Sequence, residues 1–268
     1  MKYSNKILLS DMDGTLLNSE YKVSERNREA ITYFISEGGR FGIASGRGIK
    51  NAMSFLSGIP INFYSIFLNG SILYDTRTDQ VVKTVHLNKG DVLPLLQKSL
   101  ATKSNIGIQI YTSFEGYFIS EKSNTDKHVV ADHAESSFVD VEAILDQDWA
   151  KVLFNAGSEG MKWLEQSTSE LIEKKLVDCV YSDAIYYEIL PPGSNKGAMV
   201  EYIQKLKGQG DVIYAVGNYY NDVEMIKAAD VGIFTQNTPE DLKLSHGIVC
   251  ADCDEDAIAD VIYNMMIN

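Results

Sequence analysis

Short apolar segments alternate with helical patterns over the first 80 residues. Ser24 is suited to cap a helix whose apolar positions repeat every three to four residues, and Gly38-Gly39 ends that pattern. This alternation is typical of a parallel sheet whose strands are joined by crossover helices. We expect strands at 7–10, 41–44 and 66–68, and helices from Ser24 to Gly38 and from about 48 to 56.

The same alternation returns after Pro191-Pro192-Gly193. The two ends of the chain therefore resemble the halves of one doubly wound domain. We expect helices at about 196–206, 222–228 and 256–266, and strands at 212–216, 231–234 and 248–250.

The middle of the chain has a different pattern, because its alternating strands come in pairs that resemble hairpins. Such pairs indicate an antiparallel α+β module. We therefore expect an α/β fold, with a doubly wound, mainly parallel Rossmann-like core at 1–82 and 190–268 and an inserted α+β cap domain at 83–189. Within the cap we expect strands at 106–111, 117–120, 151–155, 177–181 and 186–190, and helices at about 91–101 and 161–175.

Composition places the chain among globular proteins and restricts its partners. Of 268 residues, 45% are hydrophobic and 23% are charged, which is too apolar for a disordered chain. The net charge of −13 repels phosphodiester backbones, so we expect no nucleic-acid partner. No apolar run approaches the roughly 18 residues of a membrane helix, and Ile7–Leu9 is too short for a signal peptide. We expect a cytoplasmic protein with no membrane partner.

The cysteines and two of the histidines give no functional signal. Cys179, Cys250 and Cys253 are too few for a disulfide framework and indicate a reducing compartment. Cys250 and Cys253 form a C-x-x-C, but no second Cys/His pair has zinc spacing and the adjacent acidic residues would raise a thiol pKa. We expect a structural role for this pair. His128 and His133, five apart in a polar segment, are expected at the surface of the cap.

Asp11 and Asp13 follow the first expected strand, where open α/β sheets have their ligand crevice. Two carboxylates two residues apart on a loop can face one centre. One could attack as a nucleophile while the other transfers a proton, and both could donate oxygen to Mg²⁺. An EF-hand loop is excluded because Leu16 and Lys22 stand where it needs glycine and an acid. A solvated Asp-Gly turn remains the alternative.

Three further segments carry polar groups at the ends of expected strands or helices. Ser45-Gly46-Arg47 offers a hydroxyl, open backbone N–H groups and a guanidinium, which suit a phosphate but are also common in turns. Lys196 adds positive charge to the positive end of a helix dipole, which is favourable only if an anion or a carboxylate cluster lies opposite. Asn218 and Asp222 could point toward one centre, although Asn221 and Asp222 also suit helix caps.

These segments together resemble the motifs of the haloacid dehalogenase-like superfamily of phosphatases, and more closely its Cof-like sugar-phosphatase branch. Their order and spacing agree, and the long insertion between the second and third segments is where that branch carries its α/β cap. The resemblance covers essentially the whole chain. The matching segments are D-x-D-G-T-L-L at 11–17, S-G-R at 45–47, N-K-G at 195–197 and G-N-x-x-N-D at 217–222.

The resemblance implies a role for each matching residue. Asp11 would attack phosphorus to form an aspartyl-phosphate, and Asp13 would protonate the leaving alcohol and then activate water. Mg²⁺ would be held by Asp11, the backbone carbonyl of Asp13 and an oxygen at position 218, with Asp222 supplying charge. The groups that would hold the phosphate oxygens are the Met12 backbone, Ser45, Gly46, Arg47, Lys196 and Asn221.

One residue departs from the family pattern, because Asn218 stands where the family usually has Asp. An amide oxygen can still ligate Mg²⁺, but the site lacks one formal negative charge, so we expect weaker Mg²⁺ binding. The hypothesis is a Mg²⁺-dependent phosphomonoesterase acting on small phosphorylated metabolites, with sugar phosphates as the favoured class. The alternatives are a sugar-phosphate phosphomutase or phosphotransferase, and a phosphometabolite sensor with weakened catalysis. No pattern indicates an oligomeric state.

Overall fold

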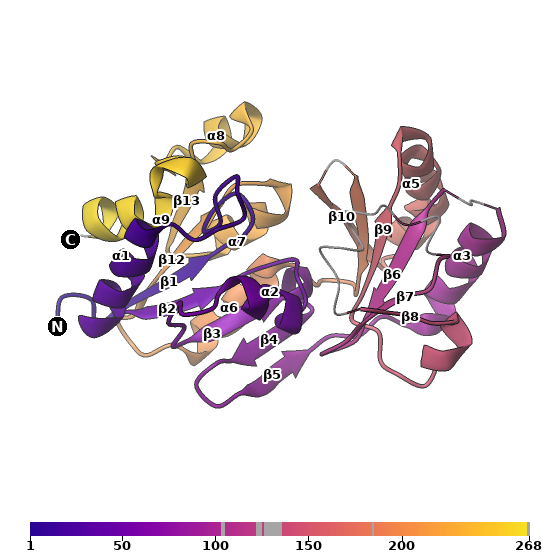
Figure 1. The fold of residues 1–268 in the computed structure, drawn as a ribbon, viewed down its shortest axis with the longest axis horizontal. Coiled ribbons are helices and arrows are strands. Elements are labelled where there is room, and N and C mark those ends of the chain that lie inside the picture. The colour runs from indigo at the N-terminus through magenta and orange to yellow at the C-terminus, as the bar shows by residue number, and fades with distance from the viewer. Residues whose placement is uncertain (103–104, 122–124, 126–135, 184, 267–268) are drawn as a thin grey trace. The chain divides into compact units, whose positions relative to one another are not determined.

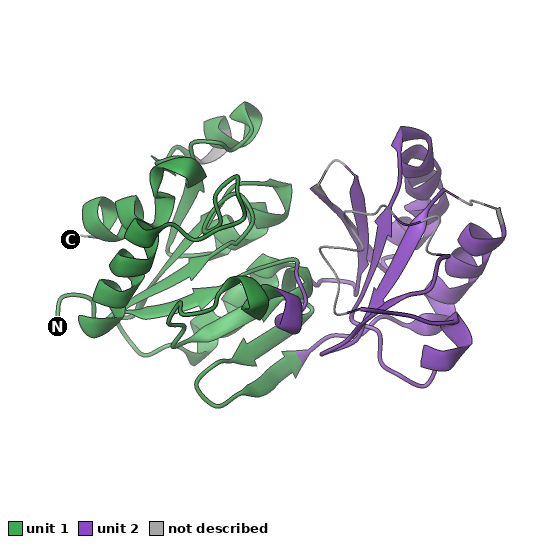
Figure 2. Ribbon diagram, in the orientation of Figure 1, with its two compact units in different colours: residues 1–46, 52–83, 195–268 green, residues 47–51, 84–194 purple. Residues whose placement is uncertain are grey.

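The computed structural model describes residues 1–102, 105–121, 125, 136–183 and 185–266, and these form two compact units (Figure 2). Unit 1 comprises Met1–Gly46, Ala52–Lys83 and Asn195–Asn268, and unit 2 comprises Arg47–Asn51 and Thr84–Ser194. The units divide after Lys83 and after Ser194, whereas the sequence pattern indicated divisions after 82 and 189. His128 and His133 lie outside the described residues.

The centre of unit 1 is a five-stranded parallel sheet (Figure 1). Strand β1, which lies between β12 and β2, is buried at all five residues, as expected for a strand covered on both faces. Because the chain moves from β1 to β2 in one direction and from β12 to β13 in the other, right-handed crossovers bring the connecting helices to opposite faces. In spatial order the strands are β14 (Val249–Cys250), β13 (Val231–Thr235), β12 (Val212–Gly217), β1 (Lys6–Ser10) and β2 (Arg40–Ile43).

Two helices of unit 1, α1 and α6, begin at residues whose side chains cap them. The Ser24 hydroxyl accepts a hydrogen bond from the Asn27 N–H at 3.1 Å, and the Asn195 side chain accepts one from the Ala198 N–H at 2.8 Å. The helices are α1 (Glu25–Ser36), α6 (Lys196–Leu206), α7 (Val223–Ala228), α8 (Glu240–His246) and α9 (Ala257–Asp260), which continues as a π-helical turn over Val261–Met265. Helix α2 (Ile49–Phe55) is divided between the two units.

A second, three-stranded sheet follows β2 and corrects one expectation. The segment predicted as a third strand of the parallel sheet forms β3 (Tyr64–Phe67), which pairs antiparallel with β4 (Ile72–Asp75); β5 (Gln80–Thr84) completes the sheet. An isolated parallel bridge joins Ala44 to Ile66, and the Ile43 N–H donates to Ser65 Oγ at 3.1 Å, but β3 is not a regular strand of the parallel sheet. The reason lies in the 3₁₀ turn Leu68–Gly70, whose three residues all have positive φ and reverse the chain directly into a hairpin.

Unit 2 contains a six-stranded, mainly antiparallel sheet with helices α3 (Lys89–Thr102) and α5 (Ser158–Glu173). Alternate residues such as Ile108, Ile110 and Phe154 pack with these helices in one hydrophobic core. The residues between them, among them Gln109 and Lys151, belong to the other face of the sheet. The strands, in order, are β10 (Asp178–Asp183), β11 (Tyr186–Leu190), β9 (Lys151–Asn155), β6 (Gly107–Tyr111), β7 (Gly116–Phe118) and β8 (Ser137–Phe138).

The architecture is the predicted α/β fold, with a parallel Rossmann-like sheet and an α+β insertion. Among the described residues, no helix has the length and apolar character needed to cross a bilayer.

Candidate active site

Polar residues follow three neighbouring strands of unit 1 at the same edge of the sheet. Asp11 comes directly after β1, Asn218 after β12, and Ser45 two residues after the end of β2. The register is fixed beside the aspartate, because the Asp11 N–H donates to the Val216 carbonyl at 2.9 Å. The carboxyl ends of adjacent parallel strands therefore bring together segments that are distant in the sequence.

Lys196 links two of these segments. It is the first residue of α6 and is fully buried. Its Nζ lies 2.7 Å from Asp11 Oδ1 and 2.6 Å from Asp222 Oδ1. Asp222 is also fully buried, and Asp11 is 5% exposed. The positive charge that was unfavourable at a helix start thus meets two carboxylates, as the sequence analysis required.

The charges in this cluster shift one another. Burial would lower the pKa of Lys196, but the negative charges of Asp11 and Asp222 outweigh it and raise that pKa above its usual value. Burial, together with the charge of Asp222, raises the pKa of Asp11 to about 7 despite the attraction of Lys196. A strongly perturbed carboxyl group beside a specific charged partner is typical of a functional site.

The second oxygen of Asp222 organises the turn after β12. Asp222 Oδ2 accepts hydrogen bonds from the backbone N–H groups of Asn218 at 2.9 Å and Tyr219 at 3.0 Å. The turn also needs Gly217, because a Cβ there would lie 2.5 Å from Asp222 Cγ. Both carboxylate oxygens of Asp222 are thus engaged within the protein. That Asp222 ligates a metal directly stays a prediction, and its contacts indicate that it positions Lys196 and Asn218.

Asn218 lies against the loop that carries the two aspartates. Gly14 has a φ of +73°, and a Cβ at this position would overlap the Asn218 side-chain amide. Asn237 also contacts this loop, since its Nδ2 donates to the Gly14 carbonyl at 2.8 Å. In the Asp11 carboxylate, Oδ1 accepts the hydrogen bond from Lys196.

This set of groups fits a hard divalent cation. A carboxylate from Asp11, the backbone at Asp13 and Gly14, and the amide of Asn218 provide oxygen atoms, which Mg²⁺ prefers. The glycine at 14 lets the Asn218 amide approach the loop closely, because a Cβ there would overlap Asn218 Nδ2. The residues present are therefore compatible with the metal that the sequence predicted.

Met12 and Asp13 occupy different environments on the same loop. Met12 is fully buried, and its carbonyl accepts the N–H groups of Thr15 at 3.2 Å and Leu17 at 2.8 Å. Asp13 is half-buried and forms a bridge with Leu17. The tight loop thus leaves the Asp13 carboxyl partly accessible, as a proton-transfer group requires. The roles of Met12 and Asp13 stay predictions.

The predicted phosphate contacts Ser45, Gly46 and Asn221 converge on a residue that the sequence analysis did not select. Asn69 donates its backbone N–H to the Ser45 carbonyl at 3.1 Å, and its Oδ1 accepts from Asn221 Nδ2 at 3.0 Å. By its sequence alone, Asn69-Gly70 is a turn signal. Its burial and its contact with Asn221 distinguish it in the structure, and neither can be derived from the local pattern.

Arg47 belongs to unit 2 by its contacts. Its Nη1 donates to Asn51 Oδ1 at 2.6 Å, one turn along the chain. Its predicted contact with phosphate stays a prediction.

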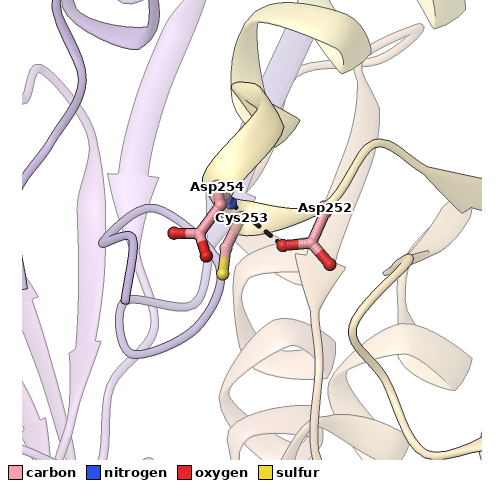
Figure 3. Close-up of side chains that lie close together, drawn as sticks. All are labelled: Asp252, Cys253 and Asp254. Carbon is pink, nitrogen blue, oxygen red and sulfur yellow. Dashed lines mark hydrogen bonds between the residues drawn. The ribbon is translucent and has the colours of Figure 1, made fainter. Parts of the chain in front are cut away.

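Cys250 and Cys253 of the C-x-x-C segment are buried close to acidic side chains. Burial, with the charge of Asp260, raises the pKa of Cys250 to about 12, and burial with Asp252 raises that of Cys253 to about 12. Figure 3 shows Cys253 beside two aspartates, and Asp252 Oδ1 accepts from the Asp254 N–H at 3.0 Å. Asp254 Oδ1 accepts the Ser19 N–H at 2.8 Å. These contacts are those of turn-forming residues, and the raised pKa values disfavour the thiolate form.

Comparisons with known proteins place this geometry in a family. A family model described as haloacid dehalogenase-like hydrolase matches residues 8–262, so the chain belongs to that family. YxeH of Bacillus subtilis (strain 168) is 27% identical over 271 residues, covering 98% of each chain. The 5-amino-6-(5-phospho-D-ribitylamino)uracil phosphatase YcsE of the same organism is 24% identical, covering 98% of this chain and 96% of its own.

Solved structures agree on the fold. A haloacid dehalogenase-like hydrolase from Bacteroides thetaiotaomicron superposes with a TM-score of 0.81 at 24% identity, covering 98% of this chain and 100% of that one. Family membership and the phosphatases among the relatives establish the enzyme class, a phosphoric monoester hydrolase. Phosphatases of this family generally use Mg²⁺ and act on small phosphorylated metabolites.

Proposed function

We propose that this chain hydrolyses sugar or polyol phosphates in a Mg²⁺-dependent reaction that passes through an aspartyl-phosphate on Asp11. The observation that carries the proposal is the buried contact of Lys196 with Asp11 and Asp222, at 2.7 and 2.6 Å. Phosphoryl transfer requires alignment and charge neutralisation more than covalent help. A fixed ammonium group beside the nucleophile supplies both.

In the first step, a carboxylate oxygen of Asp11 attacks phosphorus. A P–O bond forms to Asp11 while the bond from phosphorus to the substrate alcohol breaks, and Asp13 gives its proton to the departing oxygen. The ammonium group of Lys196 offsets the repulsion between the carboxylate and the phosphate dianion. Asp222 keeps that ammonium group in place.

In the second step, water attacks the phosphorus of the aspartyl-phosphate. Asp13 takes the proton of this water, the bond between Asp11 and phosphorus breaks, and inorganic phosphate leaves. The Asp11 carboxylate and the protonated Asp13 are restored, so the cycle is complete. The partial exposure of Asp13 supports a role that needs access to both alcohol and water.

The residues that would hold Mg²⁺ are Asp11, the Asp13 backbone carbonyl and Asn218. When bound, the cation would supply positive charge that stabilises the phosphoryl oxygens and favours the ionised form of Asp11. This second effect matters because burial raises the pKa of Asp11 to about 7. A carboxyl group with that pKa is only half ionised at about pH 7, and the ionised form is the nucleophile.

The substrate class is supported by the relatives. YcsE carries the name of a phosphatase whose substrate is a phosphorylated ribityl group joined to a uracil. We infer that the present chain takes a phosphomonoester of similar size, with unit 2 acting as the cap that contacts the part of the substrate beyond the phosphate.

The test is a phosphatase assay with the full chain, Mg²⁺, an aryl phosphate and a panel of sugar and polyol phosphates. Phosphate release should fall at least 1,000-fold in Asp11→Asn, an order of magnitude taken from the loss of a catalytic nucleophile, and should stop on chelation. Asp211→Asn is the matched control, because Asp211 is ion-paired with Arg40 next to the amino end of β12. Its activity should equal that of the parent.

Three results would contradict the proposal. Unchanged activity in Asp11→Asn would exclude the nucleophile. Transfer of the phosphoryl group to added sugar without release of inorganic phosphate would indicate a phosphotransferase. Tight binding of a phosphometabolite without turnover at saturating Mg²⁺ would indicate a sensor.

A further inference from the structure

Asn69 lies where two phosphate-binding loops of the proposed site meet. The first is the segment at Ser45 and Gly46 after β2, and the second is the turn that carries Asn221 after β12. Asn69 itself belongs to neither, because it follows β3. It is 2% exposed, so its amide group is almost fully removed from solvent.

The backbone at this position is held in an uncommon conformation. Leu68 and Asn69 have φ values of 50° and 52°, in the left-handed region that non-glycine residues rarely adopt. Asparagine tolerates this region better than most residues. The resulting turn directs the Asn69 N–H to the Ser45 carbonyl at 3.1 Å, which fixes the end of β2.

The Asn69 side chain contacts both loops. Its Oδ1 accepts a hydrogen bond from Asn221 Nδ2 at 3.0 Å. A Cβ on Gly46 would lie 3.0 Å from Asn69 Nδ2 and 3.2 Å from Oδ1, so the amide packs directly over the Gly46 backbone. One side chain therefore contacts both the Asn221 amide and the Gly46 backbone, and it can fix the orientation of the first and the position of the second.

We propose that Asn69 is a positioning residue of the phosphate site, which it organises by orienting the Asn221 amide and supporting Ser45-Gly46. The inference rests on the proposed function, because it assigns no new ligand. With one N–H of Asn221 bound to Asn69 Oδ1, the second N–H remains for a phosphate oxygen. A neutral amide is required at 69, because a carboxylate would keep the acceptor but add negative charge beside the phosphate dianion.

The experiment compares Asn69→Gly and Asn69→Asp with the parent. Glycine retains the left-handed backbone but removes the side chain, and aspartate retains shape and acceptor. Asn62→Gly is the matched control, since Asn62 also bridges backbone groups, at Phe41 and Gly39, near the amino end of β2. For each variant, the inhibition constant of inorganic phosphate, KM, kcat, the half-saturating Mg²⁺ concentration and the melting temperature are measured.

Asn69→Gly should raise both KM and the phosphate inhibition constant about tenfold, the effect of one lost hydrogen bond to a charged ligand. Asn69→Asp should raise them further, while the Mg²⁺ concentration for half-activation stays unchanged. Asn221→Ala should weaken phosphate binding by itself. The double variant Asn69→Gly/Asn221→Ala should lose less binding than the product of the two single effects, because part of the Asn69 effect passes through Asn221.

The outcomes separate this inference from the proposed function. An active parent whose phosphate inhibition constant is the same in Asn69→Gly would overturn the role of Asn69 alone. Additive effects in the double variant would also overturn it. A parent that neither hydrolyses phosphomonoesters nor binds inorganic phosphate, measured by calorimetry, would overturn both.

Discussion

Among the residues that the structure describes, two lysines are fully or almost fully buried against carboxylates, one in each unit, and their charges are balanced differently. In unit 2, Lys151 Nζ lies 3.2 Å from Glu188 Oε1, and both side chains are 3% exposed. Glu188 also accepts the Ser182 hydroxyl at 2.6 Å, and the Lys151 ammonium lies 4.8 Å from the centre of the Tyr111 ring. One positive charge thus meets one negative charge among groups that satisfy both.

In unit 1, Lys196 meets two carboxylates, Asp11 and Asp222, and Asp13 adds a third acidic group on the same loop. Two carboxyl groups thus face one ammonium group in this cluster. The difference shows how a structural ion pair can be distinguished from a cation-binding or catalytic site. A balanced pair is complete without a ligand, whereas a surplus of buried negative charge is stabilised by a cation.

The largest expected difference is in activity. Lys196→Met should lower kcat/KM at least about a hundredfold, because it removes the fixed charge beside the nucleophile. Lys151→Met should leave kcat/KM within about twofold but destabilise the fold by about 3–5 kcal/mol, because it leaves the buried Glu188 carboxylate unpaired. Steady-state kinetics at saturating Mg²⁺ and urea unfolding of each variant measure the two effects.

The control is the double variant Lys151→Met/Glu188→Leu. Replacing a buried ion pair by apolar residues of similar size is often neutral, so stability should return to that of the parent. If Lys151→Met lost as much activity per folded molecule as Lys196→Met, the contrast between a structural pair and a site would be wrong.

The next largest effect is a dependence of the unfolding free energy on pH, which arises from the titration of Asp11. Asp11 has a pKa of about 7 in the folded, metal-free protein and about 3.8 as an isolated group. Between these values the folded protein holds a proton that the unfolded chain has released. Its contribution to stability is therefore present below about pH 4 and is lost as the pH rises through 7, at up to about 1.4 kcal/mol per pH unit.

Asp11→Asn cannot release this proton. In chelator, the unfolding free energy of the parent should fall between pH 5 and pH 8 relative to that of Asp11→Asn, by a difference on the order of 2–3 kcal/mol. Mg²⁺ should reduce this difference, because the cation competes with the proton at Asp11. Parallel curves for the two proteins in chelator would refute the assignment.

The smallest expected effect concerns the missing charge at 218. Asn218→Asp should lower the Mg²⁺ concentration for half-maximal activity about fivefold, because carboxylates bind hard cations more tightly than amides do. Asn5→Asp adds the same charge at an exposed residue near the amino end of β1 and should not change the activation curve. Superimposable Mg²⁺ curves for the parent and Asn218→Asp would mean that Asn218 is not near the cation.

The sequence by itself determined the features that depend on neighbouring residues. Apolar runs predicted β1 and β12, and the capping residue Ser24 marked where α1 begins. The residues that follow the strands, such as Asp11 and Asn218, could be selected because every parallel strand of the sheet delivers its carboxyl end to the same edge. These features follow from periodicity and local hydrogen bonding, which are encoded within a few residues.

The tertiary structure decided how those segments are connected through their side chains. Lys196 and Asp11 are 185 positions apart, and Asn221 and Asn69 are 152 positions apart. No local pattern shows that both oxygens of Asp222 are engaged within the protein, or that the turn after β3 inserts Asn69 between two loops. Such contacts depend on the packing of whole elements, so their physical cause is the close approach of the strand ends of unit 1.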